Sequence, residues 1–243
     1  MRVPRLFLPF SLAAGAEITL DVRAHHHATQ VLRLRAGDAL VLFNGNGGEY
    51  AATLTAVHRR EAQATIGELL PSRPRPLLPI TLAQGVSRGE RMDFTLQKAV
   101  ELGVTAISPL ITSRVQGTDE RRLAARMAHW QGVVIAACEQ CGRDDLPALR
   151  NPQHLDDFLT SEPGKGLSLL LDPEAARGLS GITDRPNSVM LLIGPEGGLD
   201  EMERTRAKAV GFIPIRLGPR ILRTETAALA AIATVQTQWG DSG

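Results

Sequence analysis

The first seventy residues alternate between hydrophobic and polar positions in short runs that are separated by turn residues. These runs cover residues 5–10, 16–20, 39–43, 49–57 and 62–69. A period of two residues, interrupted by turns, is typical of short strands and predicts a small β-rich domain. Residues 43–49 read Phe-Asn-Gly-Asn-Gly-Gly-Glu, and this turn chemistry predicts a hairpin between the third and fourth runs.

The pattern changes after a proline-rich segment. Four prolines stand among residues 71–79, which indicates a stiff linker and places a domain boundary between residues 73 and 74. Beyond it, apolar runs at 80–86, 105–111 and 167–171 alternate with helical periodicity at 89–103 and from about 119 to 141. Alternating strands and helices predict a parallel sheet, so we expect an α/β domain over residues 74–243.

Two strand-and-loop units in the last third of the chain predict a ligand site. The continuous apolar run 189–193 predicts a buried strand, and it ends at Gly194-Pro195-Glu196-Gly197-Gly198 before a helix. A second strand at 212–217 breaks at Gly218-Pro219-Arg220 and leads into an alanine-rich helix. Ligands bind at the carboxyl ends of strands in open α/β sheets, but these glycines could equally serve only to turn the chain.

Composition narrows the class of protein without naming a function. A chain of 243 residues with 43% hydrophobic residues can bury a sizeable core, and its net charge of +1 does not by itself indicate nucleic acid. Residues 1–79 hold nine arginines and six acidic residues, so this part is the more basic. Twenty-four of the 27 basic residues are arginine, which suits phosphate recognition but also fits codon bias in a GC-rich genome. Two cysteines form no disulfide framework and favour a reducing compartment.

Common nucleotide motifs are missing from the sequence. No G-x-G-x-x-G opens a helix after a strand, and Gly164-Lys165-Gly166 lacks the order of a P-loop. A dinucleotide or ATP enzyme is therefore disfavoured. No run of apolar residues approaches the length needed to span a bilayer.

Several spaced segments of the chain together form one pattern. They are LLIGPEGGLDEME at 191–203, LGPRILRTETAALAA at 217–231, QGVSRGERMDFTLQKAVELGV at 84–104, Ser113-Arg114, IAACEQCGR at 135–143, and the His27, Val31-Leu32-Arg33 and Gly37-Asp38 element. This pattern resembles the RsmE family of SPOUT-class RNA methyltransferases. The match covers almost the full length. It implies a SPOUT-type parallel sheet with a C-terminal trefoil knot, preceded by a small β-rich PUA-like RNA-binding domain at 1–73.

The resemblance implies transfer of a methyl group from S-adenosylmethionine to N3 of a uridine in 16S rRNA of the small ribosomal subunit. Main-chain groups of three loops, at 170–172, 193–197 and 217–224, are expected to hold the cofactor. The expected cofactor contacts are Leu171, Ile193, Gly194, Glu196, Gly197, Leu217, Gly218, Ile221, Leu222 and Thr224.

Uridine N3 must lose its proton before it can accept the methyl group, so the reaction needs charge stabilisation and a proton acceptor. Arg223 is the first candidate to stabilise the anionic ring. Glu139 and Glu225 are candidate bases, although the sequence does not choose between them or an ordered water. Acids near a helix start, such as Glu196 and Glu225, are also favoured by the helix dipole alone. The expected RNA contacts are Arg2, Arg5, Arg33, Arg88, Arg114 and Arg143.

Other motifs receive a structural interpretation. Asp200 with Glu203 has the pattern of a helix cap and its box partner. His25, His26 and His27 are consecutive and cannot easily converge on one ion, so no metal site is expected. The C-x-x-C spacing of Cys138 and Cys141 lies at the end of a helix, which favours packing over redox chemistry.

The resemblance further implies a homodimer that acts in the cytoplasm on the small ribosomal subunit, with no membrane partner. Residues 1–16 look like a short signal peptide, but Pro4 and Pro9 interrupt the apolar run and the family resemblance starts at Arg2. Two rival hypotheses remain. One is a knotted methyltransferase with another target, such as a ribose 2′-hydroxyl or a tRNA base, and the other is a non-catalytic RNA-binding assembly factor.

Overall fold

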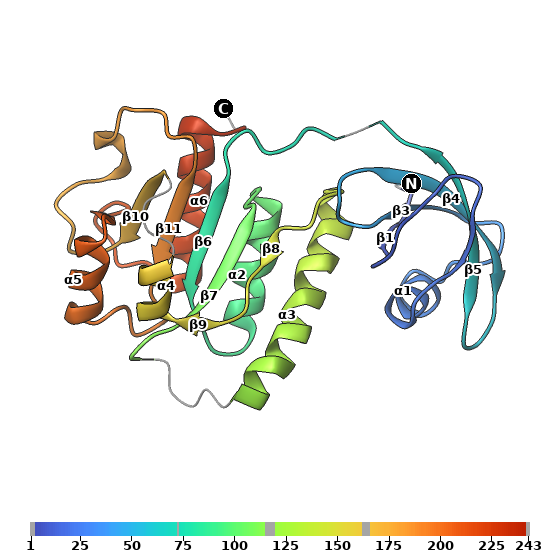
Figure 1. Cartoon of the computed structure of the whole chain (residues 1–243), viewed down its shortest axis with the longest axis horizontal. Coiled ribbons are helices and arrows are strands. Elements are labelled where there is room, and N and C mark those ends of the chain that lie inside the picture. Colours follow the sequence, from blue (N-terminus) through green and yellow to red (C-terminus); the bar gives the residue numbers. More distant parts are fainter. Residues whose placement is uncertain (1–2, 72, 115–119, 162–165, 242–243) are drawn as a thin grey trace. The chain divides into compact units, whose positions relative to one another are not determined.

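The computed structural model describes residues 3–71, 73–114, 120–161 and 166–241. The chain divides into two compact units. Unit 1 comprises Met1–Arg75 together with Ile135–Leu146, and unit 2 comprises Pro76–Val134 together with Pro147–Gly243. Figure 1 colours the elements of both units along the sequence.

Unit 1 contains a five-stranded sheet in the order β1-β3-β4-β5-β2. The antiparallel pairing of β3 with β4 confirms the predicted hairpin, and β1 runs parallel to β3. Each predicted run holds one strand; the first stops early because Pro9 has no N–H for the ladder. The strands are β1 (Arg5–Phe7), β2 (Glu17–Thr19), β3 (Ala39–Phe43), β4 (Glu49–Val57) and β5 (Ala62–Leu69).

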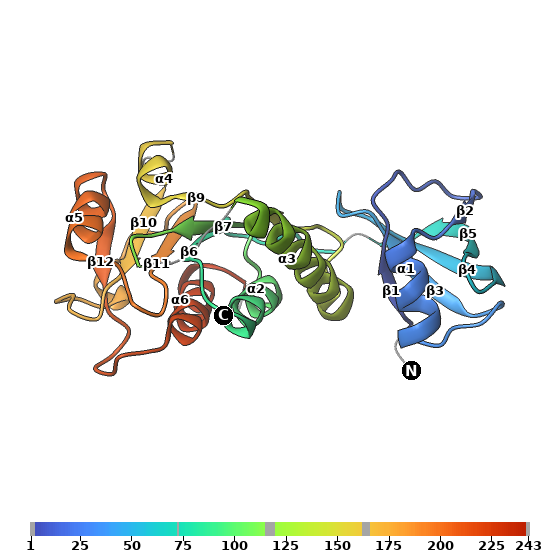
Figure 2. The same ribbon diagram turned by 90° about the horizontal axis from the view of Figure 1, so that it is seen from below.

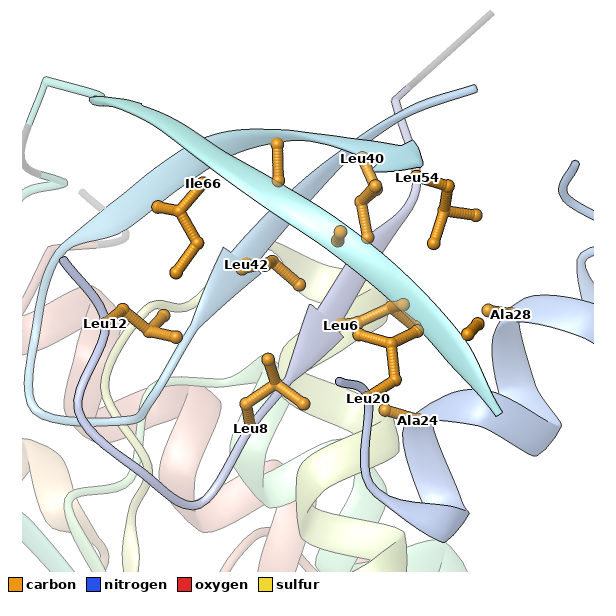
Figure 3. Packing of buried hydrophobic residues seen from close by; sticks show 13 residues of the cluster. Leu6, Leu8, Leu12, Leu20, Ala24, Ala28, Leu40, Leu42, Leu54 and Ile66 are labelled. Atoms are coloured by element: carbon orange, nitrogen blue, oxygen red, sulfur yellow. The ribbon is translucent and has the colours of Figure 1, made fainter. Parts of the chain in front are cut away.

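A small helix closes the core of unit 1. Helix α1 (Val22–His26) is capped by the Asp21 side chain, which accepts a hydrogen bond from the Ala24 N–H, and it continues into a π-helical turn (His27–Val31). Ala24 and Ala28 are separated by four residues and both face the sheet, where they are fully buried. Figure 3 shows them against leucines of the strands and loops, among them Leu6, Leu20, Leu40, Leu42 and Leu54.

Unit 2 contains a parallel sheet in the order β12-β10-β11-β6-β7-β8, with β9 also paired to β7. Every neighbouring pair described is parallel, which confirms the α/β prediction. Strand β11, near the middle of the sheet, is apolar and buried throughout because helices cover both faces. The strands are β6 (Ile80–Gly85), β7 (Ala106–Ile111), β8 (Ala148–Leu149), β9 (Gln153–His154), β10 (Leu167–Leu171), β11 (Val189–Ile193) and β12 (Ile213–Ile215).

The helices of unit 2 form a layer on each face of this sheet. On one face α2 and α6 lie side by side, and on the other α4 packs with α5 around a core that includes Leu170, Leu192 and Phe158 (Figure 2). Helix α3 contributes its last turns to unit 1. The helices are α2 (Glu90–Glu101), α3 (Glu120–Cys141), α4 (Leu155–Ser161), α5 (Glu201–Ala209) and α6 (Thr224–Trp239), with a 3-10 turn at Leu179–Gly181.

Candidate functional site

A cavity of about 460 Å³ lies where three neighbouring strands of unit 2 end. Strands β12, β10 and β11 are adjacent and parallel, so their carboxyl ends at Ile215, Leu171 and Ile193 meet at one edge of the sheet. The loops that follow these strands form the cavity wall. These are the three loops that the family resemblance implied as the cofactor site. All ten expected cofactor contacts line the cavity: Leu171, Ile193, Gly194, Glu196, Gly197, Leu217, Gly218, Ile221, Leu222 and Thr224.

The glycine loop 194–198 folds back on itself and leaves no room for a side chain at Gly194. A Cβ at Gly194 would lie 2.8 Å from the carbonyl carbon of Gly198 and 2.8 Å from the amide nitrogen of Leu199. Gly198 has a φ of 71°, a conformation that L side chains rarely adopt. The close approach and the positive φ explain why glycine stands at positions 194 and 198. The absence of side chains there also brings main-chain atoms to the cavity surface.

Glu196 joins the glycine loop to the start of α2. Its Oε1 accepts a hydrogen bond from the Arg88 N–H at 2.9 Å and another from the Arg91 guanidinium at 3.3 Å. Partial burial raises the pKa of this carboxyl, but these donors and its own N–H outweigh that effect and hold the pKa below its usual range. Glu196 is therefore an ionised anchor of the loop, and the exposed Arg88 is held there through its main chain.

A second anchor reaches the loop from the end of β7. The Arg114 guanidinium donates to the Gly197 carbonyl, and its aliphatic stem covers Gly197. Ser113, the residue before Arg114, is fixed to α5, because its N–H donates to the buried Glu203 carboxylate at 2.7 Å. Glu203 and Asp200 also form the predicted capping box, which the structure confirms. The cap thus serves the cavity wall as well as the helix.

The cavity combines an apolar floor with an excess of cationic side chains. Six arginines and three carboxylates line it. Arg223 is the exposed N-cap residue of α6, and Glu225 lies in the first turn of the same helix. The Glu225 Oε2 is buried without a hydrogen-bond partner among the described residues. The arginines that sequence reasoning did not single out are Arg91, Arg204, Arg216 and Arg220.

Glu139, the other candidate base, belongs to unit 1, whereas the cavity is lined by residues of unit 2. Glu139 is 7% exposed, and its carboxylate accepts hydrogen bonds from the Phe7 N–H and the Arg23 guanidinium, both at 2.9 Å. The His27 Nδ1 lies 3.0 Å from its second oxygen. Within unit 1, Glu139 therefore anchors α1 and β1 to the end of α3.

Two of the expected RNA contacts have their guanidinium groups engaged inside unit 1. Arg5 is 5% exposed, pairs with Glu49, donates to the Arg143 carbonyl and lies over the Phe43 ring. Arg143 forms a bidentate pair with Asp145. Burial raises the pKa of Asp145, but the hydrogen bonds and charge of Arg143 outweigh it and lower that pKa. Arg5 and Arg143 stay predictions as RNA contacts, and within unit 1 their charges are balanced by Glu49 and Asp145.

Arg33 has a different environment. It is exposed, follows the π-helical turn of unit 1, and has a φ of 57°, the only non-glycine residue in the described ranges with a positive φ. No described residue forms a hydrogen bond or an ion pair with its guanidinium. Arg2 lies outside the described residues.

The histidine and cysteine motifs have structural surroundings. The His25 Nε2 lies 3.1 Å from the His58 carbonyl oxygen, and no group of three His, Cys, Asp or Glu side chains in the described ranges is placed to hold a metal ion. Burial raises the pKa of the Cys138 thiol to about 12. Cys138 is therefore a protonated core residue. In the described part of the chain, no helix combines the length and hydrophobicity needed to cross a membrane.

Comparisons with known proteins agree with this geometry. Residues 73–236 match the family model of the RNA methyltransferase domain, and residues 20–67 match that of the RNA methyltransferase PUA domain. The fold and site thus define an RNA methyltransferase that carries a PUA domain. The ribosomal RNA small subunit methyltransferase E of Buchnera aphidicola subsp. Schizaphis graminum is 34% identical over 242 residues, which span 99% of this chain and 98% of the relative. The chain belongs to the ribosomal RNA small subunit methyltransferase E family.

Solved structures support the same assignment. A ribosomal RNA small subunit methyltransferase E from Neisseria gonorrhoeae bound to S-adenosylmethionine is 41% identical, with a TM-score of 0.92 and coverage of 100% of both chains. A methyltransferase from Legionella pneumophila in complex with the same cofactor is 39% identical, with a TM-score of 0.96 and coverage of 99% of this chain and 100% of the other.

Proposed function

We propose that this protein transfers a methyl group from S-adenosylmethionine to N3 of a uridine in the 16S rRNA of the small ribosomal subunit. The observation that carries the proposal is the meeting of three predicted loops around one cavity, with all ten expected cofactor contacts in its wall. The family supports the ribosomal RNA substrate, and the two solved relatives bind S-adenosylmethionine. The choice of N3 rests on the sequence resemblance.

The cavity fits such a cofactor. Its volume of about 460 Å³ lies within the range of small-molecule sites, and Leu171, Ile193, Leu217 and Leu222 offer apolar surface to an adenine ring. Main-chain groups of the glycine loop lie beside them for polar contacts. The buried Glu225 oxygen has no protein partner among the described residues, so it is available to a positively charged ligand or to a substrate proton.

The chemistry divides between positioning and charge. The bound cofactor supplies an electrophilic methyl group on a sulfonium, and the N–C bond to uridine N3 forms as the S–C bond breaks. We propose that Glu225 accepts the N3 proton, because its carboxylate is the one in the cavity wall with a buried, unpaired oxygen. Arg223, an exposed residue of the cavity wall, then stabilises the negative charge on the flanking uracil oxygens. Glu139 remains a prediction as a catalytic group.

RNA would reach this site along the cationic wall. The excess of arginine over carboxylate around the cavity favours the phosphate backbone. We propose Arg33, Arg88 and Arg114 as RNA contacts, and residues 1–73 as an RNA-binding domain preceding the methyltransferase domain at 74–243. A homodimer and a cytoplasmic location are further parts of the proposal, which follow from the family resemblance and the ribosomal substrate.

The test is methyl incorporation into small ribosomal subunits from a strain that lacks the corresponding enzyme. Incubation with labelled S-adenosylmethionine should place the label on N3 of one uridine in 16S rRNA. Glu225→Gln should lower turnover at saturating cofactor by about 10²-fold or more, the scale of general base catalysis. Glu201→Gln, which changes the same residue type in the first turn of α5, should keep full turnover.

Other outcomes identify the rival functions. Label on a ribose 2′-hydroxyl or on tRNA would favour a methyltransferase with another target. A chain that binds RNA but neither binds cofactor nor transfers methyl would favour the assembly factor. A single-subunit mass in solution at micromolar concentration would contradict the homodimer.

A further inference from the structure

Gln84 is a polar side chain in the buried end of β6, behind the cavity. It is 0% exposed, it stands beside Ile193 in the β6–β11 register, and it does not line the cavity. Its amide Nε2 donates two hydrogen bonds, to the Thr224 hydroxyl at 2.9 Å and to the Gly85 carbonyl at 3.0 Å. Gln84 therefore connects the central strand to the first residue of α6.

The direction of this hydrogen-bond chain is fixed by its two carbonyl ends. The Gly85 carbonyl can only accept, so the nitrogen of the Gln84 amide must face it. The same nitrogen donates to the Thr224 oxygen, which leaves the Thr224 hydroxyl proton for the Gly194 carbonyl at 2.6 Å. Donation thus runs from Gln84 through Thr224 to Gly194. This order pins the start of the glycine loop to the start of α6.

Stability alone is a poor explanation for an amide at this position. The Gln84 Oε1 is buried with no hydrogen-bond partner among the described residues. A buried, unpaired acceptor costs free energy, and an apolar side chain of the same length would avoid that cost. The NH₂ group, by contrast, is fully used. The arrangement retains the donor at the expense of the acceptor, which indicates that the donor has a function.

The two segments that Gln84 joins are two of the three cavity loops. Gly194 begins the loop after β11, and Thr224 ends the loop after β12. Neither loop is held to the other by a strand pairing, because β10 lies between β11 and β12 in the sheet. The Gln84–Thr224–Gly194 chain supplies a connection across that gap.

We infer that Gln84 is a positioning residue for the methyl-donor site, which holds the loops after β11 and β12 at the separation that the cofactor requires. This inference rests on the proposed function, since it takes S-adenosylmethionine as the ligand of the cavity. Gln84 itself does not touch the cofactor. Its loss should weaken cofactor binding, because the loops must then be ordered at the moment of binding.

The test uses the full chain and titration calorimetry with S-adenosylmethionine. Gln84→Met keeps the length of the side chain and removes both donors. We expect the dissociation constant to rise roughly tenfold, the effect of losing one well-made hydrogen bond. Turnover at saturating cofactor should stay within about threefold, because the reacting groups are unchanged. Thr224 lines the cavity itself, so Thr224→Val should weaken binding at least as much as Gln84→Met. Thr224→Ser keeps the hydroxyl and should restore most of the affinity that Thr224→Val loses. The double variant Gln84→Met/Thr224→Val should be no worse than Thr224→Val alone.

Gln236→Leu is the matched control. Gln236 is also a buried glutamine, 1% exposed, whose Nε2 donates to a main-chain carbonyl, that of Leu102 at 2.8 Å, but it lies far along α6 from the loops. Gln236→Leu should lower the melting temperature and leave the dissociation constant for S-adenosylmethionine unchanged.

Three results would overturn the inference. Gln84→Met could bind within twofold of the wild type, Gln236→Leu could weaken binding equally, or the effects of the Gln84 and Thr224 variants could be additive. If Gln84→Met does not fold, the comparison of Thr224→Val with Thr224→Ser breaks the same link from its other end. A wild-type chain that does not bind S-adenosylmethionine would refute the proposed function, and the inference with it.

Discussion

Gly85 offers the sharpest perturbation of the cavity wall, because its replacement acts on main-chain atoms that cannot easily move. A Cβ at Gly85 would lie 2.5 Å from Cδ of Pro195 and 2.8 Å from the carbonyl carbon of Gly194. Ordinary contacts between carbon atoms are 3.5–4.0 Å, so the glycine loop must shift by about 1 Å or the end of β6 must bend. Overpacking of this kind lowers the free energy of unfolding by about 1–3 kcal/mol.

The assay is chemical denaturation combined with calorimetric titration of S-adenosylmethionine. Gly85→Ala should unfold at lower denaturant concentration and lose cofactor affinity by tenfold or more, since the displaced residues Gly194 and Pro195 line the cavity. Gly132→Ala is the control, because Gly132 lies within α3 and a Cβ there meets nothing within 4 Å. It should stabilise the chain by about 0.5–1 kcal/mol and leave binding unchanged. A Gly85→Ala chain with wild-type stability and affinity would refute the close packing of β6 against the loop.

Three further predictions concern single groups. Arg33→Gly should raise the free energy of unfolding by up to about 1 kcal/mol, because glycine adopts the left-handed backbone at this position without strain, and it should weaken RNA binding. Arg35→Gly is the control: Arg35 is exposed and has no positive φ, so this variant should lower the free energy of unfolding. A change of the same sign in both variants would contradict the reasoning. Iodoacetamide at pH 8 should leave Cys138 unmodified in the native chain and modify it after unfolding, which mass spectrometry would detect, because burial raises its thiol pKa to about 12. The anchor made by Glu196 has a pKa lowered in the folded chain, so its contribution to stability should be fully present above pH 4.5 and lost as the pH falls through that lower folded value. The difference in unfolding free energy between wild type and Glu196→Gln, measured against pH, should show this loss, and a flat difference would exclude the anchor.

Much of the fold could be predicted because most elements are long and periodic. All five strands of unit 1 lie within the predicted runs, and β10 and β11 have the predicted bounds. Helix α1 and the π-helical turn were not predicted, because residues 22–31 lack a clear hydrophobic period. The segment contains three histidines, and its buried face holds only Ala24 and Ala28. The two-residue strands β8 and β9 were missed since they are too short to show a period.

The position of the cavity could be predicted from the glycine loops and the strand ends, whereas several of the arginines around it were not singled out. The cofactor contacts that the family resemblance implied all line this one cavity. The pairing of the buried Arg5 with Glu49 could not be predicted, because the two residues lie 44 positions apart in the sequence and only the folded chain brings them together. Gln84 did carry a signal: it is the one amide in the buried strand 80–85. A polar residue in such a strand requires a partner, but the sequence does not say that the partner is Thr224.

The central claim is that main-chain groups of three loops at one edge of the sheet hold the methyl donor. Hydrogen exchange with mass spectrometry, with and without S-adenosylmethionine, tests it most directly. The cofactor should slow exchange in the segments 171–173, 193–199 and 215–225, which line the cavity, and leave the strands of unit 1 unaffected. Cofactor binding without slower exchange in these three segments, or with the change confined to another part of the chain, would contradict the claim.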